Sequence, residues 1–299
     1  MGDSNSIINL GDLAKPANTL IEKISDAIGS IAKPWQIRRV AEAEAEAEKI
    51  RATGEIEITA LHRRAARRFL MEEAKKQNNI ETIISKALPE VSEQSKPEQV
   101  EDDWITNFFD KCRLISDEEM QKLWAKILAG EANSPGKFSK RTIDLLASLD
   151  KHDGMLFANL CSFNFDLGDP LPLVYDTKDH IYTDRGINFE TLSHLESIGL
   201  IQFNNLADYL RVDLNPKGFA LYFGTPVYFE FPQPSNRDLR LGKVILTQSG
   251  GQLTSICGGK PREGFIEYVR EKWKSFGYKI QPEPERPAPQ ENAPGPVQP

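Results

Sequence analysis

The chain is poor in cysteine, has no long apolar run and carries no excess of basic residues, and each absence narrows the class of protein. Its three cysteines, Cys112, Cys161 and Cys257, are odd in number and far apart, which indicates neither a disulfide framework nor a CxxC metal site. No stretch contains the roughly 18 to 20 apolar residues that a membrane-spanning helix needs, and no apolar signal segment follows the N-terminus. We therefore expect a protein of the reducing cytoplasm.

The charge balance disfavours one further class. A formal net charge of -7 argues against a general nucleic-acid binder, although a local basic patch can still bind phosphate. The acidity mainly favours solubility.

Motifs that would define an enzyme are also missing. The chain has no GxxxxGK[ST], GxGxxG or GxSxG segment, which removes the usual sequence evidence for nucleotide hydrolysis, dinucleotide binding or serine esterase chemistry. The histidines lack HExxH or cysteine-partnered spacing and so do not indicate a metal centre. They are His62, His152, His180 and His194. We expect no catalytic residue, metal or cofactor, but an enzyme whose site is assembled from distant residues stays open.

The first feature that is present is an amphipathic helix over residues 13–34, in a segment of residues 1–35. Apolar side chains recur at spacings of four, four and three residues, which is the period of one helical face. The stripe consists of Leu20, Ile24, Ile28 and Ile31, with Trp35 after it. It either docks on the protein itself or a sister subunit, or lies on a membrane surface, because Arg38 and Arg39 follow. Acidic side chains on the polar side favour the first alternative, since anionic lipids repel them.

A long charged helix is predicted next, over residues 36–91. Its first half, Ala41 to Glu48, alternates alanine with glutamate and has almost nothing to bury, so such a helix protrudes, pairs or oligomerises. Charges of opposite sign are segregated into an acidic and a basic block, which favours pairing between antiparallel or staggered copies; a single solvated helix is the alternative. The acidic block is Glu42, Glu44, Glu46 and Glu48, and the basic block is Arg63, Arg64, Arg67 and Arg68.

The second half of this helix has better apolar spacing. We expect it to pack on another element, because its apolar residues follow each other at three and four positions. They are Ile58, Leu61, Ala65 and Phe69. Residues 92–100 are predicted to be a polar linker.

Residues 101–165 are predicted to be an all-α helical module. Apolar residues recur at helical spacing in four consecutive stretches that are separated by short breaks. A capping box is predicted to begin at Ser116, and Ser139 is predicted to cap the third helix. Trp104 and Trp124 lie on the apolar stripes and are expected to be core residues rather than ligand contacts.

Residues 166–281 change to short β-prone runs that are broken by Gly, Pro, Asn and Asp, with a hairpin predicted around Gly224. Two helices are predicted, at 189–198 and 263–276. The stretch from Ile187 to Phe203 resembles the recognition helix and first wing strand of a winged helix. The fold class is thus α+β, with a long N-terminal helix, a central all-α helical module and a C-terminal winged-helix-like α+β domain.

Two basic features of this last domain suggest anion contacts. Lys260 and Arg262 follow two glycines and precede the last helix, so backbone amides and two cations could meet one phosphate; a plain surface loop is the alternative. The predicted recognition helix has no Lys or Arg, so a protein-interaction module is favoured over a DNA reader. A nucleic-acid-binding regulator stays the alternative function, with contacts at Arg237, Arg240, Lys243, Lys260 and Arg262.

The chain closes with residues 282–299, in which proline stands at nearly every other position at the start. This composition is typical of a disordered tail, because it cannot form a packed core.

Several segments carry a resemblance. They are NLGDLAKPANTLIEKIS from Asn9, DDWITNFFDKCR from Asp102, SDEEMQKLWAKILAGEANSPG from Ser116 and FSKRT from Phe138. Over about residues 7–280 the chain resembles an uncharacterised bacterial family that is described only as a domain of unknown function. Its middle segment is similar, more distantly, to the Abi-alpha proteins, which are associated with abortive infection and phage resistance. The resemblance implies no catalytic residues, and phage defence follows only by analogy.

These features lead to one hypothesis. We expect a cytoplasmic, non-enzymatic bacterial protein that self-associates through its N-terminal helices, is peripheral at the inner membrane if the first helix meets lipid, and works in phage defence. A homo-oligomer and a protein partner are the expected contacts, a membrane surface comes second, and nucleic acid is less favoured.

Overall fold

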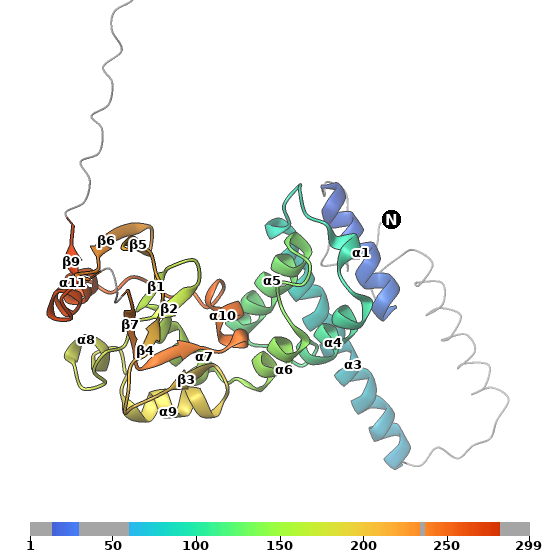
Figure 1. Ribbon diagram of the computed structural model, residues 1–299. Coiled ribbons are helices and arrows are strands. Elements are labelled where there is room, and N and C mark those ends of the chain that lie inside the picture. The colour runs from blue at the N-terminus through green and yellow to red at the C-terminus, as the bar shows by residue number, and fades with distance from the viewer. Residues whose placement is uncertain (1–13, 30–59, 234–236, 282–299) are drawn as a thin grey trace, which may run out of the picture. The chain divides into compact units, whose positions relative to one another are not determined.

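A computed structural model describes residues 14–29, 60–233 and 237–281 and confirms the α+β class (Figure 1). The chain divides into two compact units, and each is described by itself. The helical unit takes residues 1–157, 197–200 and 247–258, and the C-terminal unit takes residues 158–196, 201–246 and 259–299. The residues predicted as the acidic half of the long helix and as the proline-rich tail lie outside the described ranges.

The helical unit begins with α1 (Lys15–Ile28), which starts at a proline in its first turn and ends at Gly29. Gly29 has a φ of 67°, the left-handed conformation that glycine adopts at helix ends without a steric penalty. The helix therefore stops before residue 34, where the sequence predicted its end. Its apolar stripe packs against α4 (Asp102–Cys112) and the short 3₁₀ helix η2 (Pro97–Gln99).

Helix α3 (Ala60–Ala87) corresponds to the second half of the predicted long helix. Its last turns bury Ile80, Ile83 and Ile84, which pack against α5 (Glu118–Asn133). A 3₁₀ turn, η1 (Leu88–Glu90), follows directly. The segment predicted as a polar linker packs on the unit, because it buries Pro97 and Val100 and the Lys96 amide donates to the carbonyl of Ala132.

The four predicted helices of the central module are α4, α5, α6 (Lys140–Ser148) and α7 (Lys151–Cys161). As expected, Trp104 and Trp124 are buried, and the ring of Phe108 lies 5.1 Å from each of them. Ser139 caps α6, since its side chain accepts from the Thr142 amide. The predicted capping box is shifted by one residue, because Asp117 and not Ser116 caps α5 and accepts from two amides.

The loop between α5 and α6 is tied to the core by a buried carboxylate. Glu131 accepts from the amides of Gly136 at 2.6 Å and Phe138 at 2.9 Å, and Trp104 Nε1 donates to the Phe138 carbonyl at 2.6 Å. Burial raises the pKa of Glu131, and the hydrogen bonds from the loop amides act in the opposite direction. The segment that carries most of the family resemblance therefore has a structural role.

A short helix, α10 (Gln248–Thr254), completes the helical unit. Its Ser249 and Gln252 meet the start of α6, where the Thr142 hydroxyl bonds to both and the Ser139 amide donates to the Gln252 carbonyl oxygen. Its residues lie within the range 166–281 that the sequence assigned to the last domain, whereas the structure places this helix on α6 in the helical unit.

The C-terminal unit is built on an antiparallel sheet of order β2-β1-β5-β6-β9. The strands are β1 (Asn164–Asp166), β2 (Pro170–Pro172), β5 (Lys217–Tyr222), β6 (Thr225–Glu230) and β9 (Lys279–Ile280). The predicted hairpin is confirmed: Tyr222 pairs with Thr225 across Phe223 and Gly224, whose φ values are 46° and 86°. Two positive φ values are what a tight two-residue hairpin turn requires.

Helices and two small sheets complete this unit. Helix α11 (Phe265–Ser275) contributes the buried Phe265, Val269 and Trp273, and α8 (His180–Thr183) contributes the buried Tyr182. Helix α9 (Phe189–Ser197) precedes β3 (Ile201–Phe203), which pairs with β8 (Val244–Leu246), and β4 (Tyr209–Arg211) pairs with β7 (Leu239–Gly242). The predicted order of a helix followed by a strand is present in α9 and β3, but β3 pairs with the distant β8 rather than with the next strand in the sequence, so the winged helix stays a prediction.

None of the helices in the described ranges has the length and apolar character needed to cross a bilayer.

Two helical glycines allow a matched test of packing in the α5–α6 region. A Cβ at Gly130 would lie 2.8 Å from the ring of the buried Phe138, whereas a Cβ at Gly154 would meet nothing within 4 Å. We expect Gly130→Ala to lower the free energy of unfolding by about 1–3 kcal/mol, because overpacking outweighs helix propensity. Gly154→Ala should raise it by up to about 1 kcal/mol. Thermal unfolding followed by far-UV circular dichroism measures both, and equal shifts would contradict the close packing at Gly130.

Candidate interaction surfaces

The most unusual surface of the helical unit is the exposed half of α3. We call residues 60–75 the α3 arm, because every one of them is exposed, and Figure 1 shows this end of the helix standing clear of the neighbouring helices. Four large apolar side chains of the arm are at least 62% exposed. They are Leu61, Phe69, Leu70 and Met71. The sequence predicted that this half packs on another element, and within the chain no described element covers it.

Part of the arm continues the face that is buried further along α3. At 100° per residue, Leu61, Ala65 and Phe69 lie in the same angular sector as Ile80 and Ile83. Glu72 and Lys76 fall in this sector between the two groups, so its apolar part is interrupted by two charged residues. Only its C-terminal end is buried against α5. An apolar face that is half covered is typical of an interaction surface.

The arm is also strongly basic at one end. Arg63, Arg64, Arg67 and Arg68 belong to it, and Glu72 and Glu73 follow. One intrahelical ion pair joins Arg68 Nε to Glu72 at 3.4 Å, with both side chains more than half exposed. An exposed pair of this kind contributes little, so the basic block still presents its positive charge to a partner.

A groove lies at the base of the arm. It has a volume of about 430 Å³ and lies among the C-terminal end of α1, the middle of α3 and α4. Its apolar lining comes from Ile28, Ile80 and Phe109, and charged side chains such as Lys76 and Arg113 stand at its rim. Glu73 and Lys76 line the groove between the apolar side chains of the arm and Ile80.

The predicted contact stripe of α1 meets different surroundings along its length. Leu20 and Ile24 are fully buried against the protein's own helices, and Ile28 is half-buried at the groove. Ile31 and Trp35 lie outside the described residues. In this arrangement Leu20 and Ile24 are covered by α4 and η2, so a membrane or subunit contact through α1 stays a prediction that would require them to be uncovered.

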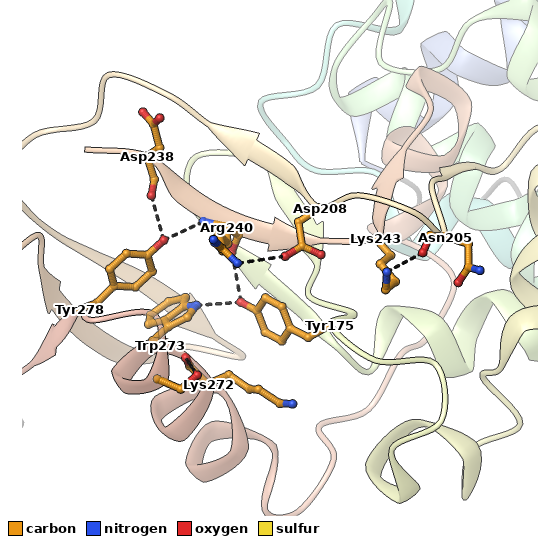
Figure 2. Close-up of polar contacts among 10 residues, drawn as sticks. Tyr175, Asn205, Asp208, Asp238, Arg240, Lys243, Lys272, Trp273 and Tyr278 are labelled. Atoms are coloured by element: carbon orange, nitrogen blue, oxygen red, sulfur yellow. Dashed lines mark hydrogen bonds and ion pairs between the residues drawn. The ribbon is translucent and has the colours of Figure 1, made fainter. Parts of the chain in front are cut away.

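In the C-terminal unit, a hydrogen-bond network surrounds Arg240 on β7 (Figure 2). The Arg240 amide donates to Tyr278 Oη at 3.1 Å, and Tyr278 Oη donates to the Asp238 carbonyl at 2.8 Å. On the other side, Trp273 Nε1 donates to Tyr175 Oη at 2.7 Å, and Tyr175 Oη donates to the Arg240 carbonyl at 3.2 Å. Two aromatic hydroxyls therefore hold the backbone of one residue, while its side chain stays half exposed.

The two hydroxyls keep their protons at neutral pH. Burial raises the pKa of Tyr175 well above its usual value of 10.0, and burial is also the largest cause that raises the pKa of Tyr278. Both tyrosines therefore act as hydrogen-bond donors throughout the physiological range.

A shallow groove of about 350 Å³ opens beside this network. Its apolar wall is formed by Leu210, Pro232, Phe276 and Tyr278. The Arg240 guanidinium lies 4.9 Å from the centre of the Phe276 ring, a cation–π contact, and 3.8 Å from the Asp208 carboxylate. These residues are distant in sequence, so no linear pattern could have indicated the groove.

The predicted anion contact is only partly available. Lys260 is exposed, but the Arg262 guanidinium bonds to Asp184 at 2.9 Å and its amide donates to Tyr222 Oη at 2.6 Å. Of the other proposed nucleic-acid contacts, Lys243 Nζ donates to the Asn205 carbonyl at 2.7 Å. Nucleic-acid binding stays a prediction, and two of its five cations already have protein acceptors at hydrogen-bond distance.

The part of the chain that the structure describes brings together no three His, Cys, Asp or Glu side chains that could hold a metal ion.

Comparison with known proteins identifies a family. The model of the family described as "Protein of unknown function (DUF2806)" matches residues 63–270, which is more than half of the chain, so the chain belongs to this family. Neither the curated proteins nor the solved structures contain a significant match. The expected domain of unknown function is thereby confirmed, and the matched range begins in the α3 arm and ends in α11.

The network around Tyr175 makes a testable contribution to stability. Tyr175→Phe leaves Trp273 Nε1 and the Arg240 carbonyl without this partner, and a buried unsatisfied group costs about 1–3 kcal/mol. We expect a loss of that size in the free energy of unfolding by urea denaturation. Tyr228→Phe is the control, because the structure shows no hydrogen bond from the Tyr228 hydroxyl to a described residue, and it should change stability by less than about 0.5 kcal/mol. Equal effects of the two substitutions would show that the network contributes nothing.

Proposed function

We propose that this protein is a non-enzymatic, self-associating interaction protein, and that the α3 arm is where one copy binds another. The observation that carries this proposal is the set of apolar side chains in one angular sector of α3, which are buried at the C-terminal end of the helix and exposed in the arm. A second copy of the chain exposes the same apolar side chains, so it can cover the arm without an unknown partner.

The energetics favour pairing only if several contacts act together. Full burial of a large apolar side chain is worth roughly 1.5–3 kcal/mol, whereas association costs an estimated 4–15 kcal/mol in lost freedom. Leu61, Phe69, Leu70 and Met71 cannot all face one partner helix, so the apolar face alone gives weak binding. A second, electrostatic contribution is therefore part of the proposal.

The sequence contains the charges for that contribution. The basic block Arg63–Arg68 has an acidic counterpart in Glu42, Glu44, Glu46 and Glu48, about twenty residues earlier in the chain. If two copies align in opposite directions, residues 42 and 46 of one lie opposite residues 68 and 64 of the other when the pairing is centred near residue 55. This register places two Glu opposite two Arg at each end of the pair, which sets its orientation.

We further propose that this self-association serves bacterial phage defence in the cytoplasm. Support comes from the more distant similarity of the middle segment to Abi-alpha proteins, and it is an argument from analogy. In cells that express the protein, variants that abolish pairing should lose protection in a phage plaque assay. If a strictly monomeric variant still protected the cells, phage defence would not depend on self-association.

The pairing itself is tested by substitutions on the arm. We expect Leu61→Ser combined with Phe69→Ser to reduce the oligomer mass measured by light scattering after size-exclusion chromatography, because the shared apolar face is lost. Arg64→Glu combined with Arg68→Glu should also weaken pairing, and high salt should weaken the wild-type oligomer, since exposed charges are screened.

The matched control removes exposed apolar side chains elsewhere in the helical unit. Leu114 and Met155 are 66% and 55% exposed and lie off the arm. Leu114→Ser combined with Met155→Ser should leave the mass unchanged. If the wild-type protein is a monomer at all concentrations, or if the control variant dissociates equally, the arm is not the subunit contact.

A further inference from the structure

The groove beside Arg240 has the character of a peptide site. Its volume of about 350 Å³ lies at the low end of ligand pockets and suits a few residues rather than a large cofactor. Phe276 and Pro232 give it a ring-lined wall, to which Tyr278 adds little because it is only 7% exposed, and Leu210 adds an aliphatic side chain that is 50% exposed. Aromatic grooves of this kind bind proline-rich segments, whose backbone is already restricted before binding.

The charged groups of the groove are available to an extended peptide. Arg240 Nη1 lies 3.8 Å from Asp208, which is longer than the roughly 2.7–2.9 Å of a strong charge-assisted hydrogen bond, and the Arg240 side chain is 53% exposed. Asp238 stands on the same rim. The groove thus offers one cation and two carboxylates beside an apolar wall.

The chain itself carries a segment of complementary composition next to the groove. The described residues end at Gln281, whose amide donates to the Tyr228 carbonyl at 3.2 Å, and Tyr278 of the groove stands just before it in the chain. Seven of the eighteen residues from 282 to 299 are proline, which favours an aromatic surface over burial in a core. The first part of this segment, residues 282–289, also contains Glu283, Glu285 and Arg286.

The position of the segment in the chain selects the occupant of the groove. We infer that residues 282–289 bind in the groove of their own chain, with Glu285 meeting Arg240 and Arg286 meeting the Asp208 and Asp238 carboxylates. In an extended proline-rich conformation eight residues span about 25 Å at ~3.1 Å each, enough to leave β9 and return along Tyr278. Attachment to β9 also gives the segment a high effective concentration, so weak contacts suffice. The groove is then a proline-rich peptide site that the chain fills itself.

Disulfide trapping in the full-length chain tests this inference. Leu210→Cys lines the groove, and Ala288→Cys lies in the segment inferred to occupy it; both are introduced with Cys257→Ser, which keeps a donor for the Thr254 carbonyl. In oxidised glutathione, mass spectrometry should show an intrachain disulfide that forms at least about tenfold faster than in the control, because docking raises the effective concentration of the two thiols. The control pairs Ala288→Cys with Leu206→Cys, which is 94% exposed and lies outside the groove.

Two further outcomes decide the inference. Adding Arg286→Glu should slow trapping at Leu210 toward the control rate, because it reverses the charge that faces the carboxylates and changes no residue of the folded unit. Equal rates for the Leu210 and Leu206 pairs, or no effect of Arg286→Glu, would show that the segment does not bind there. If the rate of disulfide formation rose with protein concentration, the segment would bind in the groove of another copy and not in that of its own chain.

Discussion

Along its last turns the apolar face of α3 packs on α5, and the order of the whole helical unit depends on this contact. Helix α5 in turn holds the η1 and η2 segments and, through Glu131, the loop that starts α6. Beyond Glu72 and Lys76, apolar side chains recur in the same angular sector of α3, and there they are exposed. Leu61 and Phe69 lie in the same angular sector of the helix as Ile80 and Ile83, yet no described element covers them.

The C-terminal unit depends on a different constraint, the satisfaction of buried polar groups. A tryptophan in the core of the unit needs an acceptor for its indole N–H, and Tyr175 provides it. The same hydroxyl must then donate, and the Arg240 carbonyl accepts it. On the other side, Tyr278 accepts from the Arg240 amide and donates to the Asp238 carbonyl, so both backbone groups of Arg240 are bonded to aromatic hydroxyls. A side chain whose backbone is held in this way is already positioned before it binds, which lowers the entropic cost of binding.

Periodicity predicted most helices of this protein because each of them buries one face. Helices α4 to α7 follow apolar spacing closely, and Gly29, Gly224 and Ser139 mark turns or caps for local steric reasons. For the arm, packing on another element stays a prediction, because the spacing of Leu61 and Phe69 indicates a buried face but cannot say what covers it. Pattern alone does not distinguish a face that meets its own chain from one that meets another molecule.

The groove at Arg240 could not be found from the sequence at all. Its residues come from β4, β7 and the end of α11, and their meeting depends on antiparallel pairing between strands far apart in the chain. Lys260 and Arg262 show the opposite case. The sequence indicated two cations for one anion, but in the folded chain Arg262 is bonded to Asp184. Local sequence states which groups are present, whereas tertiary contacts decide which of them remain available. For that reason the proposed arm contact and the inferred tail contact rest on exposure within each unit, and either can fail without the other.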